Sequence, residues 1–421
     1  MFIKNIIVKE VRHLKNFEIV LNADNRKHLI ITGKNGSGKT SLLEKMVDWL
    51  NIFESNNFTD FHSVNGNIKY YSQQIETQNK QLMQAQTEEE KIRLNAQIKS
   101  YEMGILDLRS FQKQFNGGVD LEVESISKMK EYFDNGKFII AYYCADRLIN
   151  LQAVQNITAV QLPKKYGIKE QAFSLFLQYI VNLKAKMSMA RDNGDIADVA
   201  EADKIQKWLE NLERMLQRIF DDSSLELIFD YKKLDFTIHQ KDRNPFNFTQ
   251  LSSGYSALLN IVSDIIMRME EKNNNGFDIG GIVMIDEIDT HLHIALQKKA
   301  LDILTGFFPN IQFIVTTHSP FIINSLEDAV IFDLENKERY ENLTQLSYEG
   351  VIECYFDNDM YPDKALAKFE RFRILALKND LTNDENKEFE RLRQDFIITP
   401  EVFGKEISIA AKTLLLERKA T

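Results

Sequence analysis

Residues 33–40 read Gly33-Lys34-Asn35-Gly36-Ser37-Gly38-Lys39-Thr40, which is a complete match to the Walker A pattern. A β-rich run precedes the match and an amphipathic helical run follows it, which is the context that a phosphate-binding loop requires and a chance glycine-rich turn lacks. Glycines let backbone N–H groups point at phosphates, Lys39 adds a positive charge, and the Thr40 hydroxyl can ligate Mg²⁺. We therefore expect ATP with Mg²⁺ to bind at Gly33, Asn35, Gly36, Ser37, Gly38, Lys39 and Thr40.

An acidic pair follows a second apolar run, Ile282-Val283-Met284-Ile285-Asp286-Glu287. So short a run predicts a buried parallel strand, and the carboxyl ends of such strands are where open α/β sheets bind ligands. Taken alone, the pair could equally be a solvated acidic turn. Beside a Walker A loop, Asp286 is predicted to hold Mg²⁺ and Glu287 to orient and polarise the attacking water.

A third buried strand is predicted over residues 311–316, and it delivers His318 at its carboxyl end. A lone loop histidine is more often structural. In the setting Thr316-Thr317-His318-Ser319-Pro320, we expect His318 to hydrogen-bond the γ-phosphate and the attacking water.

The fourth motif is Leu251-Ser252-Ser253-Gly254-Tyr255, followed by an apolar helix that reaches Met269. Unpaired N–H groups and the dipole at a helix N-terminus attract an anion. Taken alone, the segment could be an ordinary serine N-cap. Together with the other motifs, it predicts that Ser252, Ser253 and Gly254 cap a phosphate held by another copy, in a head-to-head dimer.

In chain order the motifs are Walker A, LSSGY, IVMIDEIDTHLH and VTTHSP. In that order they resemble the RecF/SMC-like branch of ABC ATPases, in particular its nucleases of the overcoming-lysogenization-defect type and its stand-alone bacterial defence ATPases. The most specific piece is residues 286–293, DEIDTHLH, because that branch shows an acidic pair and then His-Leu-His. The resemblance covers residues 1–50 and 225–335. It implies an α/β ABC-ATPase head, with a mixed, largely parallel sheet and a P-loop, interrupted by α-helical hairpin or coiled-coil insertions and followed by a helical tail.

The resemblance also implies roles for single residues. Asp289 and Thr290 would begin the loop that crosses the dimer interface, and Arg147, at the end of the strand after the insertion, would contact a phosphate. His291 and His293 are expected to cap helices instead. The sequence departs from the family pattern in two places. The signature reads LSSGY instead of LSGGQ, which concerns the catalytic rate rather than binding. No Q-loop glutamine stands out, since Gln73, Gln74 and Gln78 lie in the helical insertion.

Periodicity divides the rest of the chain. An apolar stripe at steps of three and four predicts an antiparallel hairpin that closes near Gln86, with Thr87 as an N-cap; its members are Leu94, Ile98, Tyr101, Ile105, Leu108 and Phe111. A second helical pair is predicted around the turn at residues 192–195, with stripes at Phe173, Phe176, Leu177, Ile180, Leu183 and Met187, and at Ile205, Trp208, Leu212, Met215 and Ile219. The expected organisation is ATPase lobe 1–66, helical hairpin 67–116, ATPase core 117–160, second helical insertion 161–223, ATPase lobe 224–360 and helical tail 361–421.

The composition favours a cytoplasmic protein. No apolar run approaches the ~20 residues of a membrane span, no signal peptide is recognised at the N-terminus, and Cys144 and Cys354 are too few for a disulfide framework. The net charge of −10, from 52 basic and 62 acidic residues, argues against strong DNA binding by the chain alone, although a local basic groove stays open.

Chain length, the two insertions and the tail resemble the ATPase subunit of Septu-type anti-phage systems, in which such an ATPase works with an HNH nuclease. The resemblance implies that the tail or the insertions dock the nuclease and that ATP closes a dimer that controls cutting. One alternative is a RecF-like repair clamp on DNA, and another is an ABC transporter subunit. A third is a nuclease with a Toprim domain, whose opening glutamate residues 348–351 could mimic, although the remaining chain is short and helical.

Overall fold

The computed structural model describes residues 1–55, 58–116, 118–146, 154–270, 279–345, 363–378 and 381–398. The chain divides into two compact units, Met1–Gln345 and Leu346–Thr421. The sequence predicts a helical tail that begins at residue 361, whereas the second compact unit begins earlier, at Leu346. Arg147, Cys354 and the Toprim-like stretch at residues 348–351 lie outside the described residues. No helix within the described ranges is both long and apolar enough to span a bilayer.

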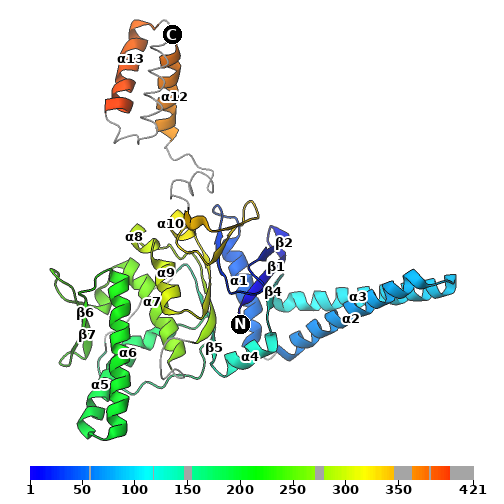
Figure 1. The fold of residues 1–421 in the computed structure, drawn as a ribbon, viewed down its shortest axis with the longest axis horizontal. Helices are drawn as coiled ribbons and strands as arrows, with labels where there is room; N and C mark the ends of the chain where they lie inside the picture. The colour runs from blue at the N-terminus through cyan, green and yellow to red at the C-terminus, as the bar shows by residue number, and fades with distance from the viewer. Residues whose placement is uncertain are drawn as a thin grey trace. The chain divides into compact units, whose positions relative to one another are not determined.

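A six-stranded sheet forms the centre of the first unit (Figure 1). Its strands, in spatial order, are β12 (Glu338–Glu341), β11 (Ala329–Asp333), β3 (His28–Thr32), β10 (Ile311–Thr316), β9 (Gly280–Ile285) and β5 (Phe138–Tyr143). All neighbouring pairs are parallel except β11 and β12. Every residue of β3, β10 and β11 is buried, which explains why these strands are continuous apolar runs in the sequence. The parallel strands therefore bring the segments that follow them to one edge of the sheet.

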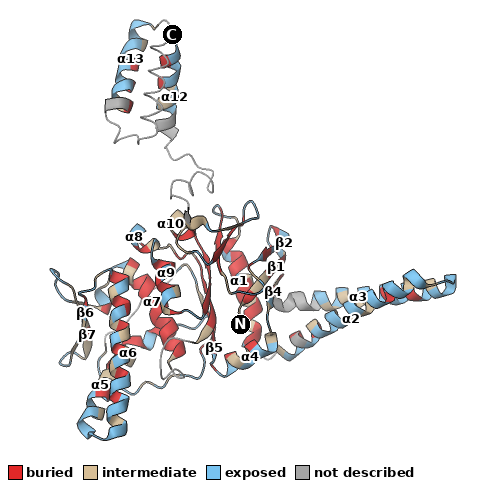
Figure 2. Cartoon of the chain, viewed as in Figure 1, coloured by how far each residue is buried: buried red, intermediate tan, exposed pale blue. Residues whose placement is uncertain are grey.

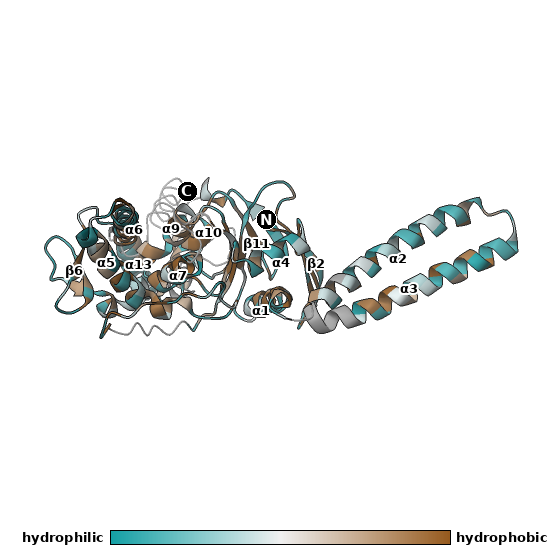
Figure 3. Cartoon of the chain, turned by 90° about the horizontal axis from the view of Figure 1, so that it is seen from below, coloured by the Kyte–Doolittle hydropathy of each residue, from teal (hydrophilic) through white to brown (hydrophobic). Residues whose placement is uncertain are grey.

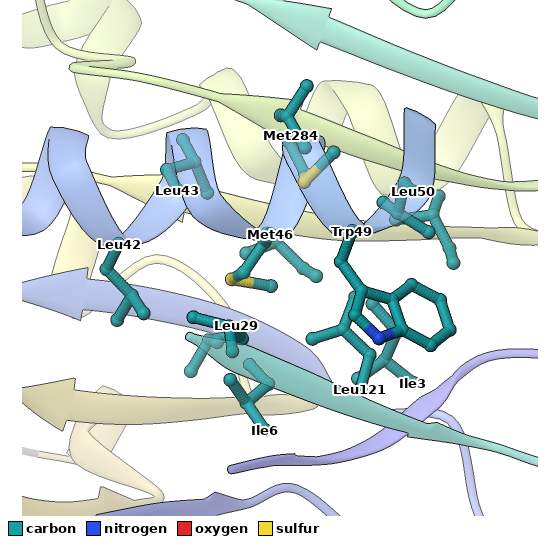
Figure 4. Close-up of a cluster of buried hydrophobic side chains, with 14 of the residues drawn as sticks. Ile3, Ile6, Leu29, Leu42, Leu43, Met46, Trp49, Leu50, Leu121 and Met284 are labelled. Atoms are coloured by element: carbon teal, nitrogen blue, oxygen red, sulfur yellow. The ribbon is translucent and has the colours of Figure 1, made fainter. Parts of the chain in front are cut away.

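Helix α1 (Lys39–Leu50) lies between this sheet and a smaller antiparallel one. The smaller sheet has the order β2 (Leu14–Val20), β1 (Ile3–Val11), β4 (Val119–Val123). In Figure 4, Leu42, Leu43, Met46 and Trp49 of α1 pack among side chains of both sheets; the partners labelled there are Leu29, Met284, Ile3, Ile6 and Leu121. Burial on both sides fixes the start of α1, and with it the glycine-rich loop.

The helical hairpin consists of α2 (Phe58–Gln84) and α3 (Glu88–Asn116), and the turn between them lies at the predicted place. Thr87 Oγ1 accepts from Glu90 N at 3.3 Å, as the predicted N-cap requires. Leu94 and Ile98 are buried, and the rings of Tyr71 and Tyr101 lie 5.4 Å apart. The outer part of the hairpin is mostly exposed and hydrophilic (Figures 2 and 3). The side chain of Phe111, the last member of the predicted stripe, is outside the described part.

The hairpin begins nine residues earlier than the predicted residue 67, because its base belongs to the core. Phe61 is 1% exposed and packs edge-to-face on Trp49 with 5.6 Å between ring centroids. Val64 is also buried. The change to polar composition near residue 67 therefore marks where α2 leaves the core, not where the helix starts.

A second pair of helices, α5 (Phe176–Asn193) and α6 (Ile196–Phe220), follows β5. Gly194 makes the turn with φ 73°, a conformation that glycine adopts readily. The members of both predicted stripes are buried, except for Leu183 and Trp208, which are partly buried. Phe173 lies in a short 3-10 helix, η2 (Ala172–Leu175), just before α5. A three-stranded sheet of β6 (Glu226–Asp230), β7 (Asp235–His239) and β8 (Phe246–Asn247) comes next along the chain.

Helix α7 (Ser253–Met269) lies on the face of the central sheet opposite α1 (Figures 1 and 2). Every residue from Ser256 to Met269 is buried. The short helix α8 (Ile294–Gln297) follows β9, and α9 (Ala300–Phe307) leads into β10. Helix α10 (Pro320–Ile323) begins directly after the histidine loop, with Ser319 as its N-cap.

The second unit contains helices α12 (Asp363–Leu377) and α13 (Asn383–Arg393), followed by a π-helical turn (Gln394–Ile398). Thr382 and Glu385 form a capping box at the start of α13. The unit has a core of its own, which consists of Phe372, Leu375, Ala376, Phe389, Leu392 and Phe396. Residues 399–421 of the expected tail are outside the described part.

Candidate nucleotide-binding site

The glycine-rich loop between β3 and α1 depends on its glycines. Gly33, Gly36 and Gly38 have φ values of 133°, 84° and 99°, which side-chain-bearing residues rarely adopt. A Cβ atom on Gly33 would come within 2.9 Å of Ser37 Oγ and 3.2 Å of Asp333 Oδ1. The loop is therefore a tight cradle, and the unpaired N–H groups of the first turn of α1 open into it.

Lys39 is folded back over this cradle. Its Nζ donates to Gly33 O at 2.8 Å and to Lys34 O at 3.1 Å, and the residue is buried. Burial lowers the pKa of Lys39, while the carboxylates of Glu287, Asp286, Asp289 and Asp333 act in the opposite direction. The lysine, the acidic pair and Asp289 thus share one electrostatic environment.

The cradle also contains a buried hydroxyl that fits a phosphate. Ser37 Oγ has no hydrogen-bond partner among the described residues, although it is covered from solvent. A buried cation, an orphaned hydroxyl, the exposed Thr40 hydroxyl and a buried carboxylate form a donor set suited to a triphosphate with Mg²⁺.

The acidic pair is held by the end of the neighbouring strand. Thr316 Oγ1 donates to Asp286 Oδ1 at 2.5 Å and accepts from Glu287 N at 2.7 Å. Asp286 is 1% exposed, and Glu287 has a φ of 45°, so the backbone turns sharply between strand and loop. Thr290 Oγ1 donates to Glu287 Oε2 at 3.1 Å. Both carboxylates are therefore oriented by threonine hydroxyls.

His318 and Asp289 meet at the same edge. Thr317 Oγ1 donates to Asp289 Oδ1 at 2.5 Å, which ties the loop after β9 to the loop after β10. Burial lowers the pKa of His318, and the positive charge of Lys39 lowers it further. The carboxylates of Asp289, Glu287 and Asp286 raise the pKa of His318, but the lowering prevails and favours the neutral imidazole, which can donate from one ring nitrogen and accept at the other.

The signature segment starts α7. Ser252 is the N-cap residue but makes no side-chain capping bond, and both Ser252 and Ser253 are exposed. A Cβ atom on Gly254 would lie 2.8 Å from His291 O, so glycine here allows the backbone of residues 291–293 to approach closely. Tyr255 stacks on Phe220, the last residue of α6, with ring centroids 4.3 Å apart.

The two histidines of the DEIDTHLH stretch have local structural roles. His293 is the N-cap of α8, and its Nδ1 accepts from Ala295 N at 3.4 Å, as predicted. His291 caps no described helix, so the prediction is correct for His293 alone; His291 is exposed and has a φ of 69°, in the turn that precedes this cap.

Four residues near the site escaped the sequence analysis. Thr316 and Thr317 belong to the histidine motif but were given no role there. Two hydroxyl side chains at the carboxyl end of a buried strand are the pattern that could have identified them. Asp333 is the last residue of β11 and lies next to the glycine-rich loop. Asp286 occupies a similar place directly after β9. His13 Nε2 lies 3.1 Å from Ser37 O, a contact between distant segments that no local pattern indicates.

Comparisons with known proteins match this part of the chain. Residues 168–324 match the family model described as "AAA domain, putative AbiEii toxin, Type IV TA system". The chain is 33% identical over 205 residues to Septu protein PtuA of Bacillus mycoides (strain KBAB4), a match that covers 46% of this chain and 28% of that protein. It is 26% identical over 359 residues to "Retron Vc95 probable ATPase" of Vibrio cholerae serotype O1 biovar El Tor, covering 72% and 68%.

The match to the Septu protein thus spans less than a third of that relative's length. Among solved structures, the SMC head domain from Thermotoga maritima aligns with a TM-score of 0.35 and 13% identity, over 79% of this chain and 94% of that one. The sequence matches relate the chain to the Septu and retron ATPases, and the motif resemblance predicted the Septu likeness.

Proposed function

We propose that this relative of the Septu and retron ATPases binds ATP with Mg²⁺ at the carboxyl edge of its central sheet, and that two copies close on two nucleotides to control a separate nuclease in anti-phage defence. The observation that carries the proposal is the convergence of Lys39, Asp286, Glu287 and His318 on the glycine-rich loop. The parallel order of β3, β10 and β9 brings these residues together from three distant segments of the chain.

Each side chain has a defined task in this proposal. Bound ATP with Mg²⁺ supplies an electrophilic γ-phosphate. Lys39 exchanges its two carbonyl acceptors for phosphate oxygens, and Thr40 and Asp286 hold the metal. Glu287 orients and polarises the attacking water, and neutral His318 hydrogen-bonds the γ-phosphate. Arg147 remains a predicted phosphate contact.

The exposed start of α7 supports the two-copy arrangement. Ser252 and Ser253 present hydroxyls and unpaired helix N–H groups to the surface rather than to a capping bond. These groups suit the γ-phosphate of a nucleotide held by a second copy. Asp289, already tied to Thr317, would then position the adjoining loop at the interface.

The defence role draws on similarity to the Septu and retron proteins, and the partner we propose is an HNH nuclease. The α12–α13 unit and the two helical pairs offer docking elements outside the nucleotide site. ATP would act as a switch, since closure of the dimer sets whether the partner cuts. The cytoplasm is the compartment we propose for this complex.

The test compares two lysines of the same loop. Lys39→Ala removes the cation over the cradle and is expected to abolish binding in a titration with a fluorescent ATP analogue. Lys34→Ala is the matched control, because the Lys34 side chain points to Glu335 in an exposed ion pair. Unchanged binding by the Lys39 variant would refute the loop assignment, and equal loss in both variants would point to general damage to the loop.

A further inference from the structure

A second cavity opens beside the nucleotide site, at the carboxyl end of β5. It has a volume of about 220 Å³ and is lined by β5 and the residues after it, by the segment before α5, and by α7. No residue of the glycine-rich loop lines it. Its lining residues are Tyr142, Tyr143, Cys144, Asp146, Lys169, Glu170, Gln171, Phe173, Asn260 and Ile261.

The wall of the cavity contains an unsatisfied amide. Asn260 is 4% exposed, and neither its Oδ1 nor its Nδ2 has a hydrogen-bond partner among the described residues. A buried polar group without a partner is destabilising, and most native proteins avoid it. Leucine would fill the same place without that cost, and the charged side chains buried in this helix, Asp264 and Arg268, are paired with each other. The amide therefore indicates a ligand that supplies both an acceptor and a donor.

Size and surroundings narrow the class of ligand. The volume falls below the roughly 300–1,000 Å³ of pockets for drug-sized molecules, so one ring system fits rather than a whole nucleotide. Aromatic side chains of Tyr142, Tyr143 and Phe173 offer flat surfaces for stacking. Among the described lining residues, the charged groups are Asp146, Glu170 and Lys169, and this acidic balance disfavours a phosphate.

We propose that this cavity binds the adenine base of an uncharged nucleoside, with the Asn260 amide turning toward the ring on binding. A carboxamide pairs with adenine through two hydrogen bonds, one to the exocyclic amine and one to the ring nitrogen next to it. The base would stack on the aromatic wall. The site is distinct from the ATP site, and it stands whether or not the proposed function is correct.

The cavity has a direct structural connection to the nucleotide site. Asp286 N donates to Tyr143 O at 2.8 Å, so the strand end that lines the cavity also holds the metal-binding aspartate. Helix α7 carries Asn260 in its middle and Ser253 at its start. A ligand in the cavity would therefore contact the end of β5, which is hydrogen-bonded to Asp286, and helix α7, which begins at Ser253.

Calorimetric titration of adenosine into full-length Lys39→Ala protein tests the proposal, since that variant has lost the ATP site. We expect one adenosine per chain, and binding weakened about tenfold or more in an added Asn260→Leu variant, as the loss of a bidentate pair predicts. Asn182→Leu is the matched control, because Asn182 is also a buried helical asparagine but does not line the cavity. No adenosine binding, equal binding after Asn260→Leu, or tighter binding of AMP than of adenosine would overturn the proposal.

A second measurement does not depend on the asparagine variants. Cys144 lines the cavity and is exposed, so a thiol reagent can follow its accessibility in a Cys354→Ser background. Adenosine is expected to slow labelling of Cys144 by several fold. An unchanged labelling rate at saturating adenosine would place the base elsewhere and overturn the proposal.

Discussion

His28 shows how a single buried side chain can link two strands of the central sheet. It lies at the start of β3, and its Nδ1 accepts from Phe313 N of β10 at 3.0 Å. The residue is 6% exposed, and burial together with the nearby positive charge of Arg26 lowers its pKa from 6.5 to about 4. The imidazole is therefore neutral in the folded protein, as an acceptor of a backbone N–H must be.

This lowered pKa predicts acid sensitivity. Above pH 6.5 the imidazole is neutral in both states, whereas between pH 6.5 and about 4 the unfolded chain binds a proton that the folded protein does not. The free energy of unfolding should fall by about 3 kcal/mol across that range on account of His28. His28→Asn keeps an acceptor for Phe313 N and should show a shallower fall. Urea unfolding followed by tryptophan fluorescence measures this difference, and parallel pH profiles of the two proteins would contradict it.

At the scale of an element, α7 is held by a buried ion pair. The side chains of Asp264 and Arg268 are 0% and 2% exposed, and Arg268 Nε donates to Asp264 Oδ2 at 2.6 Å. Asp264 also accepts from Tyr143 Oη at 2.7 Å and from Phe173 N at 3.0 Å. Arg268 donates to the carbonyls of Ile140, Gly167 and Glu170. One pair thus joins α7 to β5 and to the segment before α5.

Removing one partner of this pair should be costly. Asp264→Ala leaves Arg268 buried and uncompensated, which is expected to lower the free energy of unfolding by about 3–5 kcal/mol. Glu76→Ala, which breaks an exposed pair with Lys80 on α2, is the control and should leave the unfolding midpoint unchanged. Thermal and urea unfolding of the three proteins measure the effect. A midpoint for Asp264→Ala equal to that of the parent would contradict the assigned role.

At the scale of the whole molecule, the composite site predicts association that depends on ATP. Glu287→Gln should bind ATP but fail to polarise the attacking water, so closed dimers accumulate. Light scattering after size-exclusion chromatography should show a doubled mass in saturating ATP. A second substitution, Ser253→Arg, places a large side chain at the exposed start of α7 and should return the variant to monomers. A Glu287→Gln protein that stays monomeric in ATP would count against the composite site.

The second unit offers another test at this scale. Its core consists of its own residues, and within the described part of the first unit the core ends at Leu334. Deleting residues 363–421 is therefore expected to leave ATP binding and unfolding of the first unit unchanged while releasing the proposed nuclease partner. Co-purification of the partner with the truncated chain would rule out this unit as its docking element.

The sequence was sufficient to predict those parts of the molecule in which binding of a nucleotide requires particular residues at fixed spacing. Glycines at special φ values and acids after short apolar runs recur at fixed places, so the loop, β9 and β10 could be located before the structure. The start of α2 could not be predicted, because the segment near residue 58 is rich in asparagine and its helix is supported by core packing of Phe61 on Trp49 and of Val64. The stacking of Tyr255 on Phe220 and the approach of Gly254 to His291 likewise join distant segments.

Side-chain contacts join helix α6 to helix α7 and its C-terminal end at two widely separated points. Phe220 stacks on Tyr255 at the start of α7, and Trp208 Nε1 and Tyr179 Oη donate to Glu270, just beyond its end. Tyr255 and Glu270 are fifteen positions apart, which corresponds to about 22 Å of helix. Two contacts so far apart favour movement of α6 and α7 as one body. A protein that bound the far end of α5 and α6 would then be expected to shift Ser252 and Ser253 at the start of α7, the residues proposed to meet the nucleotide of a second copy.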